Sequence, residues 1–157
     1  MNWSEQSLLV TGGTGSFGKK FVEIMVRDCQ PRRLVIFSRD EVKQREMKAS
    51  GFDHPGIQYF VGDVRDASSL ERALAGVTVV IHAAAIKDIR ICKNSPFEAI
   101  QTNIIGCRNV VNASVGQHAT RILLLSTDKA VNAVSLYDAP KLCGEKMFVQ
   151  ANAFGRR

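Results

Sequence analysis

Two short segments near the C-terminal end carry the side chains best suited to acid–base chemistry. Residues 125–129 read Leu-Ser-Thr-Asp-Lys, and residues 137–141 read Tyr-Asp-Ala-Pro-Lys. Tyr137 and Lys141 are four positions apart, so on a helix they lie on one face. A lysine ammonium beside a phenol favours the phenolate, and Tyr137 can then act as a base near neutral pH.

The first of these segments follows an apolar run that is predicted to be a buried strand. In open α/β sheets the catalytic residues stand at the carboxyl ends of such strands. Runs of this kind are rich in Val, Ile and Leu and do not alternate with polar residues, which is typical of strands buried on both faces. The predicted strands are Ser7–Thr11, Leu34–Phe37, Gln58–Val61, Thr78–His82 and Ile122–Ser126.

Longer amphipathic stretches separate these strands and are predicted to be helices. They are Ser16–Asp28, Asp40–Ala49, Ala67–Ala75, Pro96–Gly116 and Leu136–Phe154. Alternating strand and helix units argue for a parallel sheet with right-handed crossovers and helices on both faces. The expected fold is α/β, a Rossmann-type doubly wound parallel sheet of about five strands in the order 3-2-1-4-5.

A glycine-rich loop joins the first predicted strand to the first helix. Residues 11–18 read Thr-Gly-Gly-Thr-Gly-Ser-Phe-Gly, and Gly12, Gly15 and Gly18 fall at the spacing G-x-x-G-x-x-G. Glycine lets the backbone approach a pyrophosphate closely, and the helix N-terminus supplies N–H donors and the positive end of a dipole. A glycine pattern at this junction predicts dinucleotide binding.

The end of the second strand predicts which dinucleotide binds. NAD sites usually place an acidic residue there for the ribose hydroxyls. This chain has Ser38 and Arg39, which fit a 2′-phosphate, and Asp40 is expected to cap the following helix. NADP is therefore favoured over NAD, with a solvated loop charge as the alternative interpretation of Arg39.

The third and fourth strands end in further candidate cofactor contacts. Asp63 is placed to accept a hydrogen bond from an adenine amino group, and a helix-capping aspartate is the alternative. The small side chains of Ala83, Ala84 and Ala85 would let a nicotinamide ribose lie against the backbone. His82 alone is more typical of a strand-end histidine than of a ligand.

Composition limits the class of protein. The chain has 157 residues, 45% hydrophobic and 23% charged, with a formal charge of +6. No apolar run approaches the roughly 20 residues of a membrane span, and no signal peptide is recognised, so a cytoplasmic protein without a membrane partner is expected. The basic residues are dispersed, which favours a phosphorylated small molecule over nucleic acid. The four scattered cysteines are expected to be reduced and mostly buried, with no metal site.

These motifs together resemble the extended short-chain dehydrogenase/reductase superfamily. In their order along the chain they look like the UDP-N-acetylglucosamine 4,6-dehydratases, including the inverting enzymes, and related polysaccharide-biosynthesis proteins. The segments that carry the resemblance are TGGTGSFG (11–18), FSRDE (37–41), GDVRD (62–66), HAAAIK (82–87), SPFEAIQTNIIG (95–106), NVVNAS (109–114) and STDKAVN (126–132), followed by Tyr137 and Lys141.

The resemblance implies a bound NADP that is recycled within one turnover, and a role for each catalytic residue. Tyr137 would take the proton of the sugar 4-hydroxyl while Lys141 lowers its pKa, and Thr127 would hydrogen-bond the 4-oxygen. Lys129 would remove the C5 proton and Asp128 would protonate the departing 6-hydroxyl. The implied cofactor contacts are Gly12, Thr14, Gly15, Ser16, Phe17, Gly18, Ser38, Arg39, Asp63, Val64, Ala83, Ala84, Ala85, Lys87, Tyr137 and Lys141.

Two residues of the predicted catalytic helix depart from the family pattern. Asp138 and Pro140 stand where relatives usually have Gly and Thr. Pro140 is tolerated if the helix starts near Tyr137, because the first turn needs no N–H there. Asp138 adds a negative charge that opposes phenolate formation.

The chain covers about half of the family's usual extent. Residues 1–157 are interpreted as an NADP-binding Rossmann domain, and the C-terminal substrate-binding part of the family is absent from this sequence. Two functions remain open: a UDP-N-acetylglucosamine dehydratase or its catalytic half, and a non-catalytic NADP-binding module. A homodimer through the last two long helices is also expected.

Overall fold

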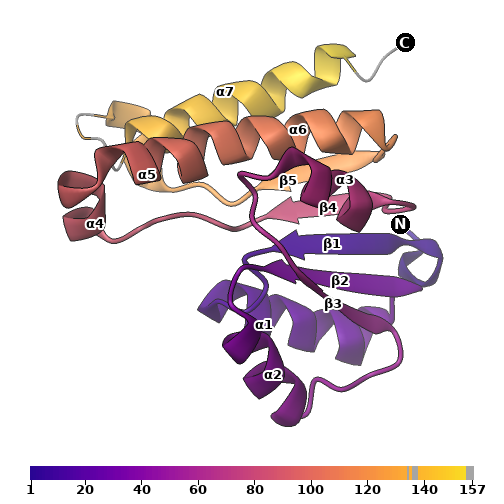
Figure 1. The fold of residues 1–157 in the computed structure, drawn as a ribbon. Helices are drawn as coiled ribbons and strands as arrows, with labels where there is room; N and C mark the ends of the chain where they lie inside the picture. The colour runs from indigo at the N-terminus through magenta and orange to yellow at the C-terminus, as the bar shows by residue number, and fades with distance from the viewer. Residues whose placement is uncertain (134, 136–137, 155–157) are drawn as a thin grey trace.

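A computed structural model describes residues 1–133, 135 and 138–154. The described residues form one five-stranded parallel sheet in the order β3-β2-β1-β4-β5 with helices on both faces, which confirms the predicted fold (Figure 1). The strands are β1 (Ser7–Thr11), β2 (Arg33–Ser38), β3 (Ile57–Val61), β4 (Val79–His82) and β5 (Arg121–Leu124).

The helices cover the two faces of the sheet as separate groups (Figure 1). The α-helices are α1 (Ser16–Ile24), α2 (Glu41–Ala49), α3 (Ala67–Leu74), α4 (Ile89–Asn94), α5 (Pro96–Ile100), α6 (Gly106–Gly116) and α7 (Ala139–Phe154). Short 3₁₀ helices are η1 (Trp3–Glu5) and η4 (Asp128–Asn132), and π-helical turns are η2 (Met25–Cys29) and η3 (Gln101–Ile105).

Successive residues of the central strands feed two separate cores. Leu8 and Val10 of β1 pack with Val22 of α1 and Met47 of α2. Leu9, one position along the strand, belongs to the opposite core with residues of α3, α6 and α7. Because strand side chains alternate between faces, a strand covered by helices on both sides must be apolar throughout.

The edge strands are less buried than predicted. Val61 of β3 is 52% exposed and Leu123 of β5 is 56% exposed, so the expectation of strands buried on both faces is wrong for these two. Each has a hydrogen-bonded neighbour on one side among the described residues, and the helices cover the middle of the sheet more completely than its margins. β5 also ends at Leu124, two residues earlier than predicted.

Helix starts follow the expected capping residues. Asp40 caps α2 by accepting a hydrogen bond from the backbone N–H of Lys43 at 2.9 Å. Asp66 caps α3 by accepting from Ser68 and Ser69 at 3.0 and 3.2 Å. α7 begins at Ala139, so Pro140 occupies its first turn, as a tolerated proline requires.

α2 and α3 differ from their predicted bounds by one residue each, and the other three predicted helices differ more. The stretch 16–28 ends in the π-helical turn η2, and the stretch 96–116 is α5 and α6 joined by η3. The predicted first residue of the last helix, Leu136, lies outside the described residues. Within the described residues, no helix is both long and apolar enough to cross a membrane.

Candidate functional site

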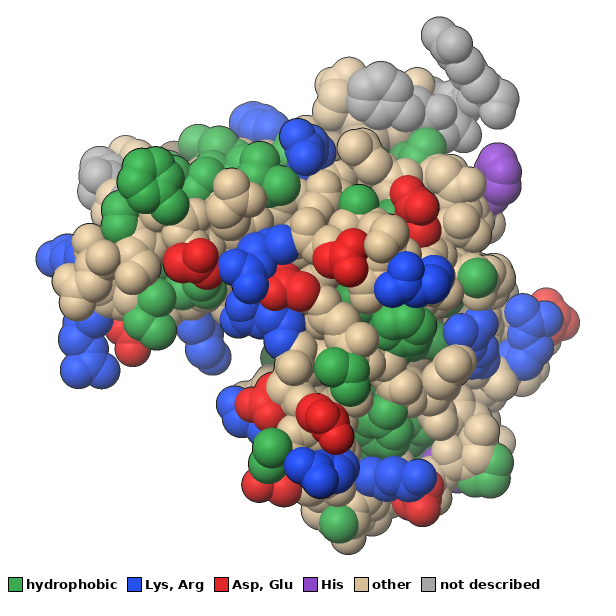
Figure 2. All heavy atoms as spheres, viewed as in Figure 1, with side chains coloured by type: hydrophobic (Ala, Val, Ile, Leu, Met, Phe, Trp, Pro, Cys, Tyr) green, Lys and Arg blue, Asp and Glu red, His purple; other side chains and the backbone are tan. Residues whose placement is uncertain are grey.

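A cavity of about 480 Å³ lies at the carboxyl ends of the strands. Figure 2 shows the molecule hollowed on this side, between α1 and α2 below and α4 and α5 above. The predicted cofactor residues that line the cavity are Gly12, Thr14, Gly15, Ser16, Phe17, Gly18, Ser38, Arg39, Val64, Ala83, Ala84, Ala85, Lys87 and Lys141. The fold therefore gathers residues from five separate segments around one hollow.

Some predicted site residues are not in this lining. Thr127 lines the cavity together with Lys141, whereas Asp63, Asp128 and Lys129 do not. Tyr137 lies outside the described residues. The roles assigned to all of these residues stay predictions.

The glycine loop forms a cradle that larger residues would fill. Gly12 has a φ of +66°, and a Cβ atom there would lie 2.9 Å from the backbone of Ala84. A Cβ atom on Gly18 would collide with the backbone of Gly13. Gly15 caps α1, and its N–H donates to the Gly12 carbonyl at 3.0 Å. Bare backbone at the N-terminus of a nine-residue helix fits a pyrophosphate.

A buried hydroxyl fixes the opposite wall of the cavity. Thr11 Oγ1 accepts hydrogen bonds from the backbone N–H groups of Ala83 and Ala84, each at 3.1 Å. The same hydroxyl lies 2.7 Å from His82 Nδ1, so its proton is directed to that nitrogen. Burial lowers the pKa of His82 to about 3, with the positive charge of Lys141 as a smaller cause. His82 is thus a neutral structural residue, in agreement with the interpretation of a strand-end histidine.

The end of β2 brings two cations to the cavity. Ser38 Oγ lies 2.9 Å from Thr14 Oγ1 and accepts from the backbone N–H of Asp40 at 3.2 Å. Arg39 lines the cavity with a half-exposed side chain. Lys43, in the first turn of α2 and four residues after Arg39, also lines it. Sequence reasoning missed Lys43, although the cap at Asp40 fixes its place in the first turn of α2.

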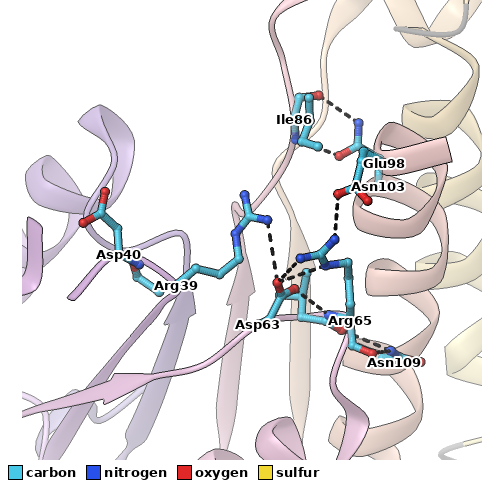
Figure 3. A network of polar contacts seen from close by, with 10 residues as sticks. Arg39, Asp40, Asp63, Arg65, Ile86, Glu98, Asn103 and Asn109 are labelled. Carbon is cyan, nitrogen blue, oxygen red and sulfur yellow. Dashed lines mark hydrogen bonds and ion pairs between the residues drawn. The ribbon is translucent and has the colours of Figure 1, made fainter. Parts of the chain in front are cut away.

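Asp63 is the centre of a charged network (Figure 3). Its Oδ2 accepts from Arg65 Nε at 2.9 Å and from Arg65 Nη2 at 2.7 Å, while Arg39 Nη1 lies 3.6 Å away. The other guanidinium nitrogen, Arg65 Nη1, donates to Glu98 at 2.7 Å. The cap of α3 is Asp66, so the alternative of Asp63 as the helix cap is wrong.

Two asparagines hold the loops behind this network. The side chain of Asn103, in η3, both donates to and accepts from the backbone of Ile86, each at 2.8 Å. Asn109 Nδ2 donates to the carbonyls of Val64 and Arg65 at 3.1 and 3.0 Å. Both contacts are drawn in Figure 3. The long α5–α6 segment thereby fixes the loops that follow β3 and β4.

The segment after β5 is fastened to α7 at two consecutive residues. Lys141 Nζ donates to the Leu125 carbonyl at 2.9 Å, and Ser126 Oγ donates to Glu145 Oε1 at 2.5 Å. Burial lowers the pKa of Lys141. Lys141 and Glu145 are one helical turn apart, so a single face of α7 holds the strand end that leads to Thr127.

After these two contacts with α7 the chain enters η4. Thr127 Oγ1 donates to Asp128 Oδ1 at 3.0 Å, and the same carboxylate oxygen accepts from the backbone N–H of Lys129 at 3.0 Å. The Asp128 carboxylate is therefore turned toward the start of η4. On the next segment, the buried Asp138 accepts from Ser135 Oγ at 2.6 Å.

The remaining surface agrees with the composition. Figure 2 shows Lys and Arg side chains interspersed with Asp and Glu over the face drawn. Cys92 and Cys107 are buried, Cys29 is partly buried and Cys143 is exposed, all as free thiols. Half of the cysteines are thus buried, fewer than expected. Within residues 1–133, 135 and 138–154, no group of three His, Cys, Asp or Glu could hold a metal ion.

Comparison with known proteins gives concordant matches. The model of the polysaccharide biosynthesis protein family matches residues 8–157. A UDP-N-acetylglucosamine 4,6-dehydratase (inverting) of Campylobacter jejuni is 47% identical over 150 residues, which is 96% of this chain and 45% of that protein. This chain spans about half the length of the curated relatives it matches.

Two solved structures are similar over most of this chain. The X-ray structure of Pen from Bacillus thuringiensis matches with a TM-score of 0.92 and 31% identity, over 98% of this chain and 47% of that one. The Bordetella bronchiseptica enzyme WbmG, solved in complex with NAD, matches with a TM-score of 0.78 and 26% identity, over 94% of this chain and 50% of its own.

Proposed function

The chain belongs to the polysaccharide biosynthesis protein family, and from that premise we propose that it is the NADP-binding, catalytic half of a nucleotide-sugar 4,6-dehydratase. The proposed substrate is UDP-N-acetylglucosamine, and the proposed location is the cytoplasm. The observation that carries the proposal is that the glycine cradle, Arg39, Thr127 and Lys141 all line one cavity. In this proposal residues 1–157 act as the cofactor domain.

The residues present fit a dinucleotide along the whole cavity. The cradle at Gly12 and Gly15 takes the pyrophosphate, because bare backbone N–H groups and the start of α1 favour an anion. Arg39 and Lys43 take the 2′-phosphate, and this pair of cations supports NADP. WbmG was solved with NAD, so the preference is a property to be tested in this chain.

At the other end, the chain's residues prepare the sugar for proton transfer. Lys141 Nζ donates to the Leu125 carbonyl. In the proposed mechanism its positive charge serves to favour the phenolate of Tyr137, which takes the proton of the sugar 4-hydroxyl. Thr127 donates to the same oxygen once its hydroxyl proton turns away from Asp128 Oδ1. A bound nicotinamide supplies the site with reversible hydride acceptance.

The dehydration step uses the two residues at the start of η4. Lys129 acts as the base toward C5, and Asp128 acts as the acid toward the 6-hydroxyl. Both follow directly on Thr127, and the Asp128 carboxylate accepts from Thr127 Oγ1 and from the Lys129 N–H. Neither residue lines the cavity, so each role requires its side chain to turn toward the sugar.

The decisive experiment incubates the purified chain with NADP and UDP-N-acetylglucosamine and follows the nucleotide sugar by mass spectrometry. Formation of a 4-keto-6-deoxy product supports the dehydratase. Binding of NADP(H) without product overturns catalysis by this chain and supports the second candidate, a non-catalytic NADP-binding module. That candidate needs only the glycine cradle and the cations that line the cavity. An Asp128→Asn or Lys129→Ala variant with full activity contradicts the assigned roles.

The surface of α6 and α7 supports the proposal of a homodimer. An apolar groove of about 520 Å³ lies between α6 and α7 and includes Val111, Met147 and the 69% exposed Val149. Burying such a surface against a second copy is favourable. Light scattering at micromolar concentration tests this, and a monomer contradicts it.

A further inference from the structure

A carboxylate lies close enough to Arg39 to form an ion pair with it. The Asp63 carboxylate, at the loop after β3, has Oδ2 3.6 Å from Arg39 Nη1 (Figure 3). Only 22% of the Asp63 side chain is exposed, so solvent screens this charge incompletely. A carboxylate here would attract Arg39 and repel a phosphate dianion on the same side of the cavity.

Arg65 neutralises most of the Asp63 charge. It makes a forked contact to Asp63 Oδ2 through Nε and Nη2, and its own backbone N–H donates to Asp63 Oδ1 at 2.9 Å. Both carboxylate oxygens are therefore occupied by Arg65. Burial acts to raise the pKa of Asp63, but its contacts with Arg65 together outweigh this and lower it, and the same ion pair raises the pKa of Arg65.

The position of Arg65 is itself fixed from two sides. Its Nη1 donates to Glu98 of α5 at 2.7 Å, and its carbonyl accepts from Asn109 of α6 at 3.0 Å. These partners hold the guanidinium against Asp63 and away from the cavity, which Arg65 does not line. The planar fork suits a carboxylate in a way that lysine does not.

We infer that Arg65 is a specificity-determining positioning residue, which sets the preference for a 2′-phosphorylated dinucleotide by neutralising Asp63 and so leaving Arg39 to the phosphate. The inference rests on the proposed NADP site. It assigns the discrimination to a residue that does not line the cavity. Without Arg65, the Asp63 carboxylate pairs with Arg39 instead and weakens its contact with the 2′-phosphate.

The test compares the affinities of the 157-residue chain for NADPH and NADH by fluorescence titration. In Arg65→Gln the dissociation constant for NADPH should rise about tenfold, which corresponds to one weakened phosphate contact. The constant for NADH should stay within about twofold or fall. A structural role alone would weaken both nucleotides equally, so the ratio of the two constants is the informative readout.

Two further variants sharpen the comparison. Asp63→Asn combined with Arg65→Gln removes the unpaired carboxylate, and the NADPH to NADH ratio should return toward that of the wild type. Arg27→Gln is a matched control, because Arg27 makes a similar forked pair with Asp28, at 2.7 and 2.8 Å, remote from the cavity. It should leave the ratio unchanged.

The outcomes separate the inference from the proposed function. If wild-type protein binds neither nucleotide, the proposed function fails and the inference fails with it. If wild-type protein prefers NADPH, an equal loss of both nucleotides in Arg65→Gln overturns the inference alone. An unchanged ratio in Arg65→Gln, or a double variant that keeps the altered ratio, overturns it as well.

Discussion

Gly12 and Ala84 lie in direct backbone contact: a Cβ atom on Gly12 would be 2.9 Å from both N and Cα of Ala84. The loop after β1 and the loop after β4 therefore touch, and Thr11 ties them together through the Ala84 N–H. Since both loops line the cavity, the shape of the cradle depends on this contact.

Gly12→Ala should be more damaging than an ordinary glycine substitution. Alanine at a positive φ costs about 1–2 kcal/mol, and here the added methyl group also collides with Ala84. Gly76→Ala is the matched control, because Gly76 has a φ of +71° with nothing within 4 Å of its Cβ position. Urea unfolding should give a clearly larger loss for Gly12→Ala, and equal losses would contradict the close approach.

The sequence was sufficient for much of the fold because buried parallel strands are continuous apolar runs. β1 matches its prediction at both ends. The glycine loop was equally readable, since Gly12 and Gly18 occupy positions that only glycine fits. The local sequence therefore predicts those parts of the structure that depend on local backbone geometry.

The parts that were missed depend on contacts distant in the sequence. The π-helical turn η3 interrupts a stretch with helical periodicity, and its Asn103 binds the backbone of Ile86. α4 was missed for a different reason: its cap is local, since the Asp88 side chain accepts from the Arg90 N–H at 2.8 Å, but six residues are too few to show a helical pattern. The pairing of Arg65 with Glu98 joins residues 33 positions apart, which no local pattern encodes.

Arg39→Gln should weaken NADPH binding selectively. Loss of a guanidinium–phosphate contact is expected to raise the NADPH dissociation constant about tenfold while NADH changes little. Lys43→Gln should act in the same direction with a smaller effect, because lysine makes no forked contact. Lys48→Gln is the control, because Lys48 lies on α2 like Lys43 but forms an exposed ion pair with Asp53. It should change neither constant. Equal loss of both nucleotides in Arg39→Gln would contradict a 2′-phosphate contact.

Ser126 and Glu145 should be energetically coupled. The hydrogen bond between them joins the strand end to α7, and bonds to charged groups contribute on the order of 1–3 kcal/mol. Urea unfolding of Ser126→Ala, Glu145→Ala and the double variant forms a double-mutant cycle. A coupling free energy of about 1 kcal/mol is expected. Simple additivity of the two single changes would count against this hydrogen bond.

His82 should make the protein less stable in mild acid. Its pKa is about 3 in the folded state and near 6.5 when unfolded, so between these values the unfolded chain binds more protons. The free energy of unfolding should therefore fall as pH drops from 6.5, by at most about 1.4 kcal/mol per pH unit.

The histidine contribution is isolated by substitution. His82→Gln should flatten the pH dependence of urea unfolding between about pH 4.5 and 6.5. His118→Asn is the control, because His118 is exposed and has a positive φ that asparagine tolerates. Parallel stability curves for wild type and His82→Gln would show that His82 is not buried in its neutral form.

The most direct test of the account is a calorimetric titration of the purified 157-residue chain with NADPH and, separately, with NADH. The account predicts saturable binding of one NADPH per chain, tighter than that of NADH. The absence of saturable binding for either nucleotide would contradict it.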